Sequence, residues 1–184
     1  MIVEEFVILV DQNDHEIGEM EKQEAHLQNK KHRAFSVFLL DENNNLILQQ
    51  RAASKYHSPG LWTNACCGHP RPNETTIQAA KRRTLEEMGI NVDIHEIFQL
   101  SYEEQLENGL WENEFDHIFI GKYTEKNFNP NPEEIQNLKH ISIKDLQIDL
   151  IKNPEEYTFW FKLIFPKIVD YNVDIRHKTI DARQ

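Results

Sequence analysis

The sequence is poor in cysteine, and its only two cysteines are poorly placed to pair with each other. Among 184 residues there are only Cys66 and Cys67, which are adjacent. Neighbouring residues rarely give the Cα separation that a disulfide requires. We therefore expect two free thiols and a reducing compartment. A chain of this length can bury roughly 70% of its unfolded surface, so one domain can fold without disulfide or metal support.

Basic residues are also in short supply. The chain has 20 lysines and arginines against 31 aspartates and glutamates, a formal net charge of −11. A nucleic-acid partner requires a net basic face, so this balance excludes nucleic acid as a bulk ligand. A small phosphorylated substrate remains compatible, because a few local lysines and arginines can hold it against a negative background.

Long apolar runs are absent as well. No apolar run approaches the roughly 20 residues needed to cross a bilayer, and the first residues, MIVEEFVILVDQ, lack the charged segment and cleavage site of a signal peptide. We expect a soluble, cytoplasmic protein with no membrane partner. The sequence shows no internal repeat and no linker, and it does not indicate an oligomeric state.

Turn signals and apolar periodicity predict an α/β (α+β) chain with a mixed sheet. The expected strands are short apolar runs at 6–10, 17–20, 34–40, 46–50, 65–68, 94–102 and 112–123. Residues 22–32 and 51–64 are expected to be irregular. A helix is expected over 75–88, with Gly89 as its stop, a second from residue 143, and a third from Pro154 to about 169. The polar tail from Asp174 is expected to be loose.

The segment from Trp62 to Gly89 contains most of the candidate chemistry. In the strand 65–68, alternation places Cys67 and His69 on one face and Cys66 on the other. A single cysteine most often packs in a core. The neighbouring imidazole and the acidic helix that follows favour a pocket-facing thiol at Cys67 and a core role for Cys66.

The helix that follows offers charged groups at the edge of the same pocket. Helical periodicity places Arg83 and Glu87 where they can face one edge, whereas Arg82 and Glu86 point outward, as in an exposed ion pair. A carboxylate such as Glu87 beside a pocket is a suitable Mg²⁺ ligand, because Mg²⁺ prefers oxygen donors shared with phosphates.

Histidines and a second acidic strand suggest a further metal site. Alternation puts Glu112, Glu114 and Asp116 on one face, although charges on a strand usually form its solvated face. Three imidazoles together with Glu112 and Glu114 would suit Mn, Fe or Zn better than Mg. The imidazoles flanking expected strands are His26, His32 and His69. The remaining six histidines are interpreted as structural or surface residues: His15, His57, His95, His117, His140 and His177.

A spaced motif in this region resembles the Nudix box. It reads G-x5-E-x7-R-x3-E-E-x-G and consists of Gly68, Glu74, Arg82, Glu86, Glu87 and Gly89. The box usually has a glutamate directly after its arginine, and this chain has Arg83. In the hydrolases that glutamate helps to bind metal for water attack, so the departure favours holding a diphosphate over cleaving it.

The flanking segments resemble type I isopentenyl-diphosphate isomerase over about residues 4–165. They are HRAFSVFLL (32–40), residues 51–55, LWTNACCGHP (61–70), WENE (111–114) and EYTFWFKLI (156–164). The resemblance implies a single Nudix-like domain over 1–184, with its core at about 4–170 and a mixed sheet between helices. It also implies an isomerase that transposes a C=C bond, interconverting isopentenyl and dimethylallyl diphosphate.

The same resemblance implies residue roles. The catalytic group is Cys67, Glu114, Tyr102 and Trp160, with Cys67 and Glu114 as proton carriers. The diphosphate contacts are Lys22, Arg51, Lys55 and Arg83. One divalent metal, Mn²⁺ or Zn²⁺, is held by His26, His32, His69, Glu112 and Glu114, and a Mg²⁺ that touches the substrate diphosphate is held by Glu87.

The expected chemistry is physically consistent with these roles. Protonating an alkene creates a tertiary carbocation, so the site must stabilise positive charge and exclude water. Two proton carriers are needed, ideally on opposite faces of the alkene, and the face of Trp160 can stabilise a cation. Two alternatives remain open: a Nudix hydrolase of a nucleotide-type diphosphate, and a non-enzymatic ligand sensor of the same fold.

Overall fold

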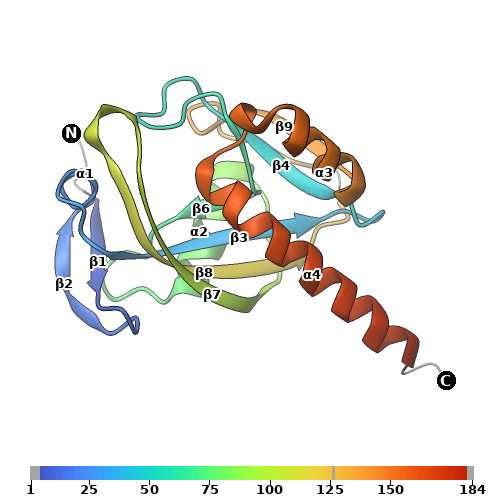
Figure 1. Cartoon of the computed structure of the whole chain (residues 1–184), viewed down its shortest axis with the longest axis horizontal. Coiled ribbons are helices and arrows are strands. Elements are labelled where there is room, and N and C mark those ends of the chain that lie inside the picture. The colour runs from blue at the N-terminus through green and yellow to red at the C-terminus, as the bar shows by residue number, and fades with distance from the viewer. Residues whose placement is uncertain (1–4, 126, 182–184) are drawn as a thin grey trace.

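The computed structural model describes residues 5–125 and 127–181, with side chains described as far as residue 171. Along the described residues, two strands and a short helix come first, followed by further strands, a central helix, more strands and two final helices (Figure 1). The strands are β1 (Phe6–Val10), β2 (Glu16–Glu21), β3 (His32–Leu40), β4 (Leu46–Arg51), β5 (Trp62–Thr63), β6 (Cys66–Gly68), β7 (Ile94–Gln105), β8 (Trp111–Lys122) and β9 (Ile135–Ile141). The α-helices are α1 (Lys22–Leu27), α2 (Thr76–Met88), α3 (Ile143–Lys152) and α4 (Phe159–Asp181), and short 3₁₀ turns cover Glu107–Gly109 and Pro154–Glu156.

Strand β3 is the centre of a mixed sheet. It pairs in parallel with β8 and antiparallel with β1, β4 and β6. At the outer parts of the sheet, β7 pairs with β8 and β9 pairs with β4, both antiparallel. Eight of the nine residues of β3 are buried, which explains its nearly continuous apolar sequence, because a strand covered on both faces needs no polar alternation.

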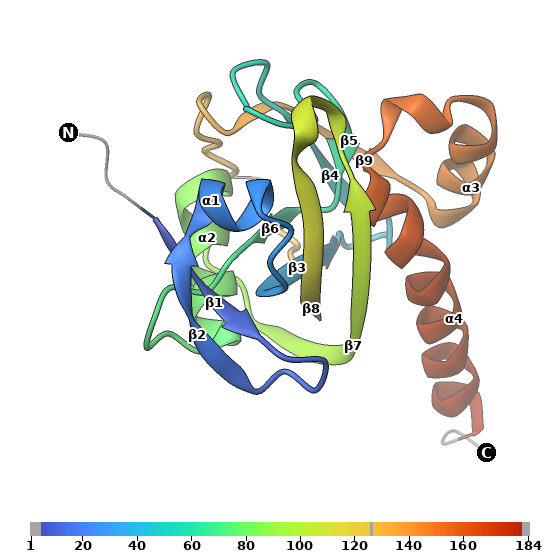
Figure 2. The same cartoon turned by 60° about the vertical axis from the view of Figure 1, so that its left-hand side comes forward.

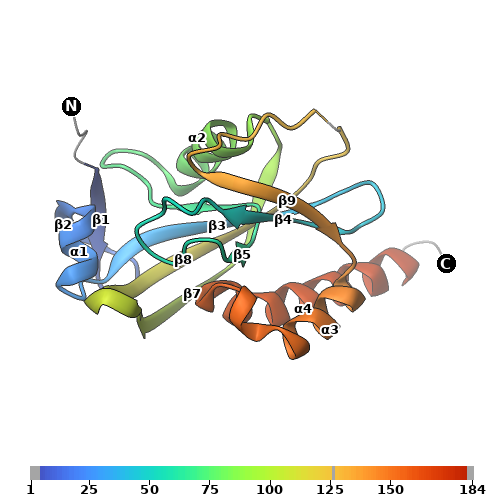
Figure 3. The ribbon, with the colours of Figure 1, turned by 90° about the horizontal axis from the view of Figure 1, so that it is seen from above.

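Helices cover both faces of this sheet, with α2 on one side and α3 and α4 on the other (Figure 3). Alternate residues of β3 pack against the helices on the two faces of the sheet. Val37 packs in a core cluster with Ala80 and Met88 of α2, while Phe38 packs in a second cluster with Phe161 of α4. The fold is therefore the expected α+β arrangement of a mixed sheet between helices. The β1–β2 hairpin and α1 lie at the end of the sheet away from α4 (Figure 2).

Several expected elements are confirmed by local interactions. Thr75 caps α2 in a reciprocal capping box with Gln78, and Gly89 ends the helix at φ +71°. Ser142 caps α3 by accepting a hydrogen bond from the Asp145 amide. The expected strands at 6–10 and 17–20, at 34–40 and 46–50, and at 94–102 and 112–123 each form an antiparallel pair.

The expectation of irregular structure over 22–32 and 51–64 was partly wrong. Residues 22–27 form α1, because the Glu21 carboxylate accepts hydrogen bonds from the amides of Gln23 and Glu24 and so caps a short helix. Within the second segment, Trp62 and Thr63 form β5 against β4. Strand β9 was not among the expected strands, because its charged and amide side chains conceal its alternation.

The final helix also differs from expectation. Helix α4 begins at Phe159 and not at Pro154, because Tyr157 forms a parallel bridge with Trp62 and the Thr158 amide donates to the Trp62 carbonyl. These contacts hold the chain extended between the 3₁₀ turn and the helix. The backbone continues in α4 as far as Asp181, where a loose tail was expected. Among the described residues, no helix combines the length and apolar character needed to cross a membrane.

The end of α2 generates a stability prediction. Gly89 has φ +71°, and a Cβ atom there would lie 2.5 Å from the Asn129 carbonyl oxygen. Gly109 has φ +75° with nothing within 4 Å of such an atom. We expect Gly109→Ala to lower the free energy of unfolding by about 1–2 kcal/mol from backbone strain alone. Gly89→Ala should lower it by at least about 1 kcal/mol more, because of the added overlap.

Urea denaturation of both variants measures these differences. Equal losses in the two variants would contradict the proposed overlap with the segment around Asn129, because the two glycines share the left-handed backbone and differ in their surroundings.

Candidate active site

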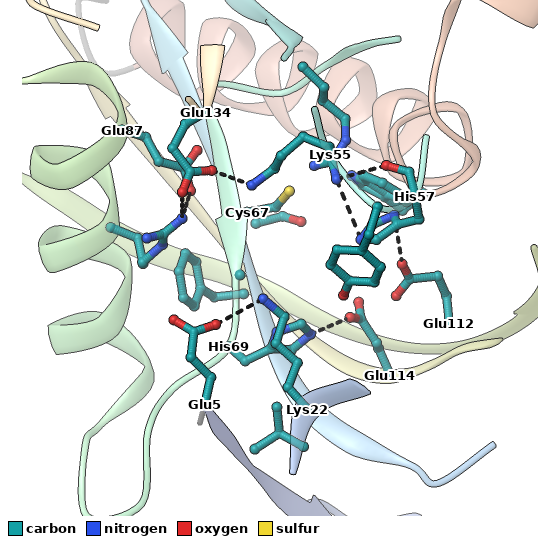
Figure 4. A pocket seen from close by; sticks show the side chains of 18 of the residues that line it. Glu5, Lys22, Lys55, His57, Cys67, His69, Glu87, Glu112, Glu114 and Glu134 are labelled. Carbon is teal, nitrogen blue, oxygen red and sulfur yellow. Dashed lines mark hydrogen bonds and ion pairs between the residues drawn. The ribbon is translucent and has the colours of Figure 1, made fainter. Parts of the chain in front are cut away.

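One pocket collects almost every candidate residue (Figure 4). Its lining comes from the start of β1, α1, β3, β4, the loop after β4, β6, α2, β7, β8, residue 134 just before β9, and the first turn of α4. Glu87 and Glu134 lie on one side, Glu112 and Glu114 on the other, and Cys67 lies between them. The expected residues in its lining are Lys22, Arg51, Lys55, Cys67, His69, Arg83, Glu87, Tyr102, Glu112, Glu114 and Trp160.

The two cysteines divide as the strand alternation predicts. Strand β6 pairs with β3 so that Cys67 lies opposite Ser36. Cys66 is fully buried in the core beneath α2, whereas Cys67 lines the pocket. Burial raises the pKa of Cys67 to about 12, although Arg51 acts in the opposite direction. Near neutral pH this group is therefore a thiol, the form that can donate a proton.

Glu114 is held by two neighbouring side chains. Register places it opposite Tyr102 on β7, and the Tyr102 hydroxyl donates a hydrogen bond to its Oε2. Its other oxygen lies 2.8 Å from His69 Nε2. Burial alone would raise the pKa of Glu114, but the neighbouring imidazoles of His32 and His69 outweigh burial and hold the pKa well below its usual range.

Three imidazoles converge on the Glu114 carboxylate. The candidate ligand atoms of His26, His32, His69 and Glu114 all lie within 4.8 Å of one another. The Nε2 atoms of His32 and His69 lie 3.2 Å apart. Nitrogen donors at this spacing, together with a carboxylate, match a transition-metal or zinc site better than a magnesium site.

The ring tautomers show that these residues fit a metal ion. His26 Nδ1 lies 2.6 Å from the Lys22 carbonyl, and His32 Nδ1 lies 2.8 Å from the Lys30 carbonyl. A carbonyl can only accept, so each Nδ1 carries the proton and each Nε2 has a free lone pair. The buried His26 Nε2 has no hydrogen-bond partner among the described residues, which is the state of a ligand directed at a cation.

The electrostatics of the group also favour a cation. Burial lowers the pKa of His26 to about 4 and that of His69 to about 3, so both rings are neutral. Burial and the nearby Glu114 together raise the pKa of Glu112 well above its usual range. Glu112 lies at the margin of the group, with its Oε2 3.7 Å from His26 Nε2. A divalent ion would offset the repulsion between the two buried carboxylates.

Glu87 lies apart from the imidazole group, on the side of the pocket formed by α2. Arg83 Nη2 donates to its Oε1 at 2.7 Å, and the Gln49 amide donates to its Oε2 at 3.1 Å. Arg83 also pairs with Glu134, which forms a second ion pair with Lys55. Arg83 and Lys55, two of the expected diphosphate contacts, are thus already paired with the carboxylates of Glu87 and Glu134.

The other two expected diphosphate contacts, Lys22 and Arg51, have different partners. Lys22 pairs with Glu5 at 3.0 Å. Arg51 donates to the backbone carbonyls of His57 and Ser58, at 3.1 and 3.2 Å, and its guanidinium carbon is 5.5 Å from the centre of the Trp160 ring. Arg51 therefore lies between the loop after β4 and α4.

Three interpretations of charged residues require correction. Glu112 and Glu114 are buried and not on a solvated strand face, because the loop after β4 and α1 cover this end of β8. Arg82 pairs with Glu86 as expected, but it makes its shorter bonds, both 2.7 Å, to Glu74 and lines the pocket. His57 is not a surface residue: its side chain is 11% exposed and lies between the imidazole group and Trp160.

Other pocket residues had no signal in the sequence. Glu5 and Glu134 were not identified, because each is a single acid at the edge of a strand in an acidic chain. Gln49 was overlooked because a glutamine on a predicted strand is usually solvated, whereas here it is buried. Only the proximity of Tyr56 and His57 to Lys55 could have directed attention to that loop.

The comparisons with known proteins agree with this geometry. The family model for the NUDIX domain matches residues 30–161. An isopentenyl-diphosphate Delta-isomerase of Pectobacterium atrosepticum is 46% identical over 165 residues, covering 90% of this chain and 92% of that protein. One from Photobacterium profundum is 43% identical over 179 residues, covering 95% and 97%.

Solved structures show the same fold at low identity. The protein DR0079 of Deinococcus radiodurans superposes with a TM-score of 0.67 at 17% identity, covering 80% of this chain and 90% of that one. A MutT protein of Methanosarcina mazei gives 0.64 at 17% identity, covering 77% and 95%. The fold is thus shared with the wider Nudix group, while sequence identity above 40% over at least nine-tenths of the chain relates it to the isopentenyl-diphosphate Delta-isomerases. The chain belongs to the isopentenyl-diphosphate Delta-isomerases of the Nudix superfamily.

Proposed function

We propose that this pocket interconverts isopentenyl and dimethylallyl diphosphate, with Cys67 and Glu114 as its two proton carriers. The observation that supports these roles is the position of the two side chains in one pocket. The two residues belong to β6 and β8, which pair with opposite sides of β3 (Figure 1), and both line one pocket that also contains Trp160. A substrate between them would have one proton carrier on each side.

The reaction then proceeds by addition and removal of one proton. One carrier donates its proton to the terminal CH₂ carbon of isopentenyl diphosphate, and the π electrons form the new C–H bond. The tertiary cation that results loses a proton from the carbon next to the diphosphate-bearing one, and this proton goes to the second carrier. The double bond has moved, and atoms and charge are conserved. Cys67 and Glu114 exchange roles in the reverse direction.

Trp160 is suited to stabilise the cation. The ring is 97% buried, and the Arg51 guanidinium carbon lies 5.5 Å from its centre, so this ring already accommodates a positive group. A desolvated cation over an indole face gains on the order of 2 kcal/mol. Tyr102, through its hydrogen bond to Glu114, is proposed to fix the orientation of that carboxylate.

Lys22, Arg51, Lys55 and Arg83 are proposed to bind the diphosphate. All four line the pocket, and two of them face Glu134. Arg83 replaces the box glutamate that hydrolases use, and its pairing with Glu87 places a cation where a hydrolytic metal ligand would otherwise be. This substitution supports retention of the diphosphate during the reaction.

For the metals, we propose Mn²⁺ or Zn²⁺ at His26, His32, His69 and Glu114, with Glu112 completing the set, and Mg²⁺ at Glu87 together with the substrate. When bound, such ions supply positive charge that lowers the proton affinity of a ligated carboxylate and neutralises phosphate oxygens. The site residues themselves hold and orient the transferred proton. We further propose that the protein acts in the cytoplasm, a reducing compartment in which its two cysteines would remain free thiols.

One assay distinguishes isomerisation from hydrolysis. Isopentenyl diphosphate is followed by NMR in deuterated water, and phosphate release from nucleotides is measured in parallel. We expect deuterium incorporation and dimethylallyl diphosphate without phosphate release, because Arg83 occupies the position of the hydrolytic glutamate. Phosphate release without isomerisation would overturn the proposal.

The adjacent cysteines provide a matched pair of variants. Cys67→Ala should lower turnover by about 10²- to 10⁴-fold or more, the usual contribution of a general acid or base, with little change in thermal stability. Cys66→Ala should retain turnover but lower the free energy of unfolding by about 1 kcal/mol, because it removes a buried core group. A Cys67→Ala variant that retained more than a few per cent of activity would exclude its role as proton carrier.

Metal removal tests the imidazole group. Treatment with a strong chelator should reduce isomerisation to background, and Mn²⁺ or Zn²⁺ together with Mg²⁺ should restore it. Elemental mass spectrometry of the untreated protein identifies the ion, and His26→Ala serves as a matched variant that should contain less of it. Full activity in a metal-free sample would rule out the metal requirement.

A further inference from the structure

His57 has no role in the proposed reaction, yet it lies within the site. It belongs to the loop between β4 and β5 and lines the pocket. Its ring stacks against His26, with centroids 6.2 Å apart, and meets the Trp160 ring edge-on at 5.8 Å. It therefore separates the imidazole group from the proposed cation-stabilising ring.

Arg51 fixes the backbone of this loop. Its Nη2 donates to the His57 carbonyl at 3.1 Å and its Nε to the Ser58 carbonyl at 3.2 Å. Ser58 has φ +46°, a left-handed conformation that these contacts hold in place. The imidazole of His57 is therefore presented to the pocket from a backbone that Arg51 anchors at two successive carbonyl groups, those of His57 and Ser58.

The same arginine determines the tautomer of the ring. Arg51 Nη2 lies 3.4 Å from His57 Nε2. An arginine can only donate, so Nε2 accepts and the ring proton lies on Nδ1. His57 Nδ1 is thus a buried donor, and it has no hydrogen-bond partner among the described residues. Buried donors without partners are rare, so this one calls for an acceptor.

The nearest carboxylate to that donor is Glu112. His57 Nδ1 lies 3.6 Å from Glu112 Oε1, just beyond hydrogen-bond range (Figure 4). On the other side, Glu112 Oε2 lies 3.7 Å from His26 Nε2. The carboxylate is therefore placed between a donor on one side and the metal-binding group on the other. A shift of a few tenths of an ångström would complete the bond to His57.

We propose that His57 is a positioning residue whose Nδ1–H donates to Glu112 and orients this carboxylate toward the metal-binding group. The inference rests on the proposed metal role of Glu112. Direct ligation by His57 is disfavoured, because Nδ1 carries the proton and the ring lies outside the four-residue group. The contact also connects Arg51, a proposed diphosphate ligand, to Glu112 through a single imidazole.

The test measures metal binding directly and without substrate. Metal-free protein is titrated with Mn²⁺, and free Mn²⁺ is followed by electron paramagnetic resonance. We expect His57→Ala to weaken binding about 10- to 100-fold, the usual effect of losing a residue that orients a ligand. His57→Asn should regain most of the affinity, because the asparagine amide can place a donor near the Nδ1 position. The melting temperature of each metal-free variant reports whether it is folded.

Two further variants make the outcomes distinct. His117→Asn removes a histidine that also lies between two carboxylates, Asp14 and Glu96, but outside the pocket, and it should bind Mn²⁺ as the parent does. His26→Ala removes a proposed ligand. If His26→Ala loses Mn²⁺ affinity while His57→Ala does not, the positioning role of His57 is wrong and the metal site is supported. The same conclusion follows if His57→Asn binds Mn²⁺ as weakly as His57→Ala does. If His26→Ala also binds normally, the proposed metal site itself is wrong.

Discussion

The arrangement of the site depends on the register of β3 against β8. Their parallel pairing places His32 directly opposite Glu114, and the antiparallel pairing of β8 with β7 places Tyr102 opposite the same glutamate. On the other side of β3, β6 is held so that Cys67 lies opposite Ser36. A slip of one residue would turn every one of these side chains to the opposite face. Because β3 packs on both faces against two separate core clusters, such a slip would also exchange the side chains that fill each cluster and disrupt the packing of both.

Within this frame, the pocket gathers charges that a protein interior ordinarily excludes. Glu112 and Glu114 are buried side by side, and burial keeps the neighbouring His26 and His69 rings neutral by lowering their pKa values. On the side formed by α2, Arg83 and Lys55 share Glu134. The buried carboxylate pair is costly in isolation and becomes favourable once a cation arrives, whereas the cations on the α2 side already have carboxylate partners. The site is thus suited to at least one cation, which agrees with the proposed divalent metal.

Local sequence patterns were sufficient to predict part of the fold and part of the site. Strand alternation separated Cys67 from Cys66, and capping residues placed α2 and α3, because these features depend on neighbours only. The roles of Tyr102 and Trp160 came from the family resemblance. The positions of His57 and Glu134 could not be predicted, because they are set by loops whose paths depend on contacts with distant strands. The start of α4 was misplaced for the same reason: the bridge from Tyr157 to Trp62 joins segments far apart in the chain.

The pairing of β3 with β8 also has a consequence for how the molecule folds. His32 and Glu114 are about eighty residues apart, and contacts at such separation form slowly because a long loop must first be closed. The four-residue group therefore does not exist in the unfolded chain or in its isolated hairpins. A ligand that binds this group selects the native state and increases its population by mass action, with a stabilisation that grows with the logarithm of ligand concentration. Occupancy by the proposed metal would then increase the folded fraction of the chain, in addition to its proposed role in the chemistry.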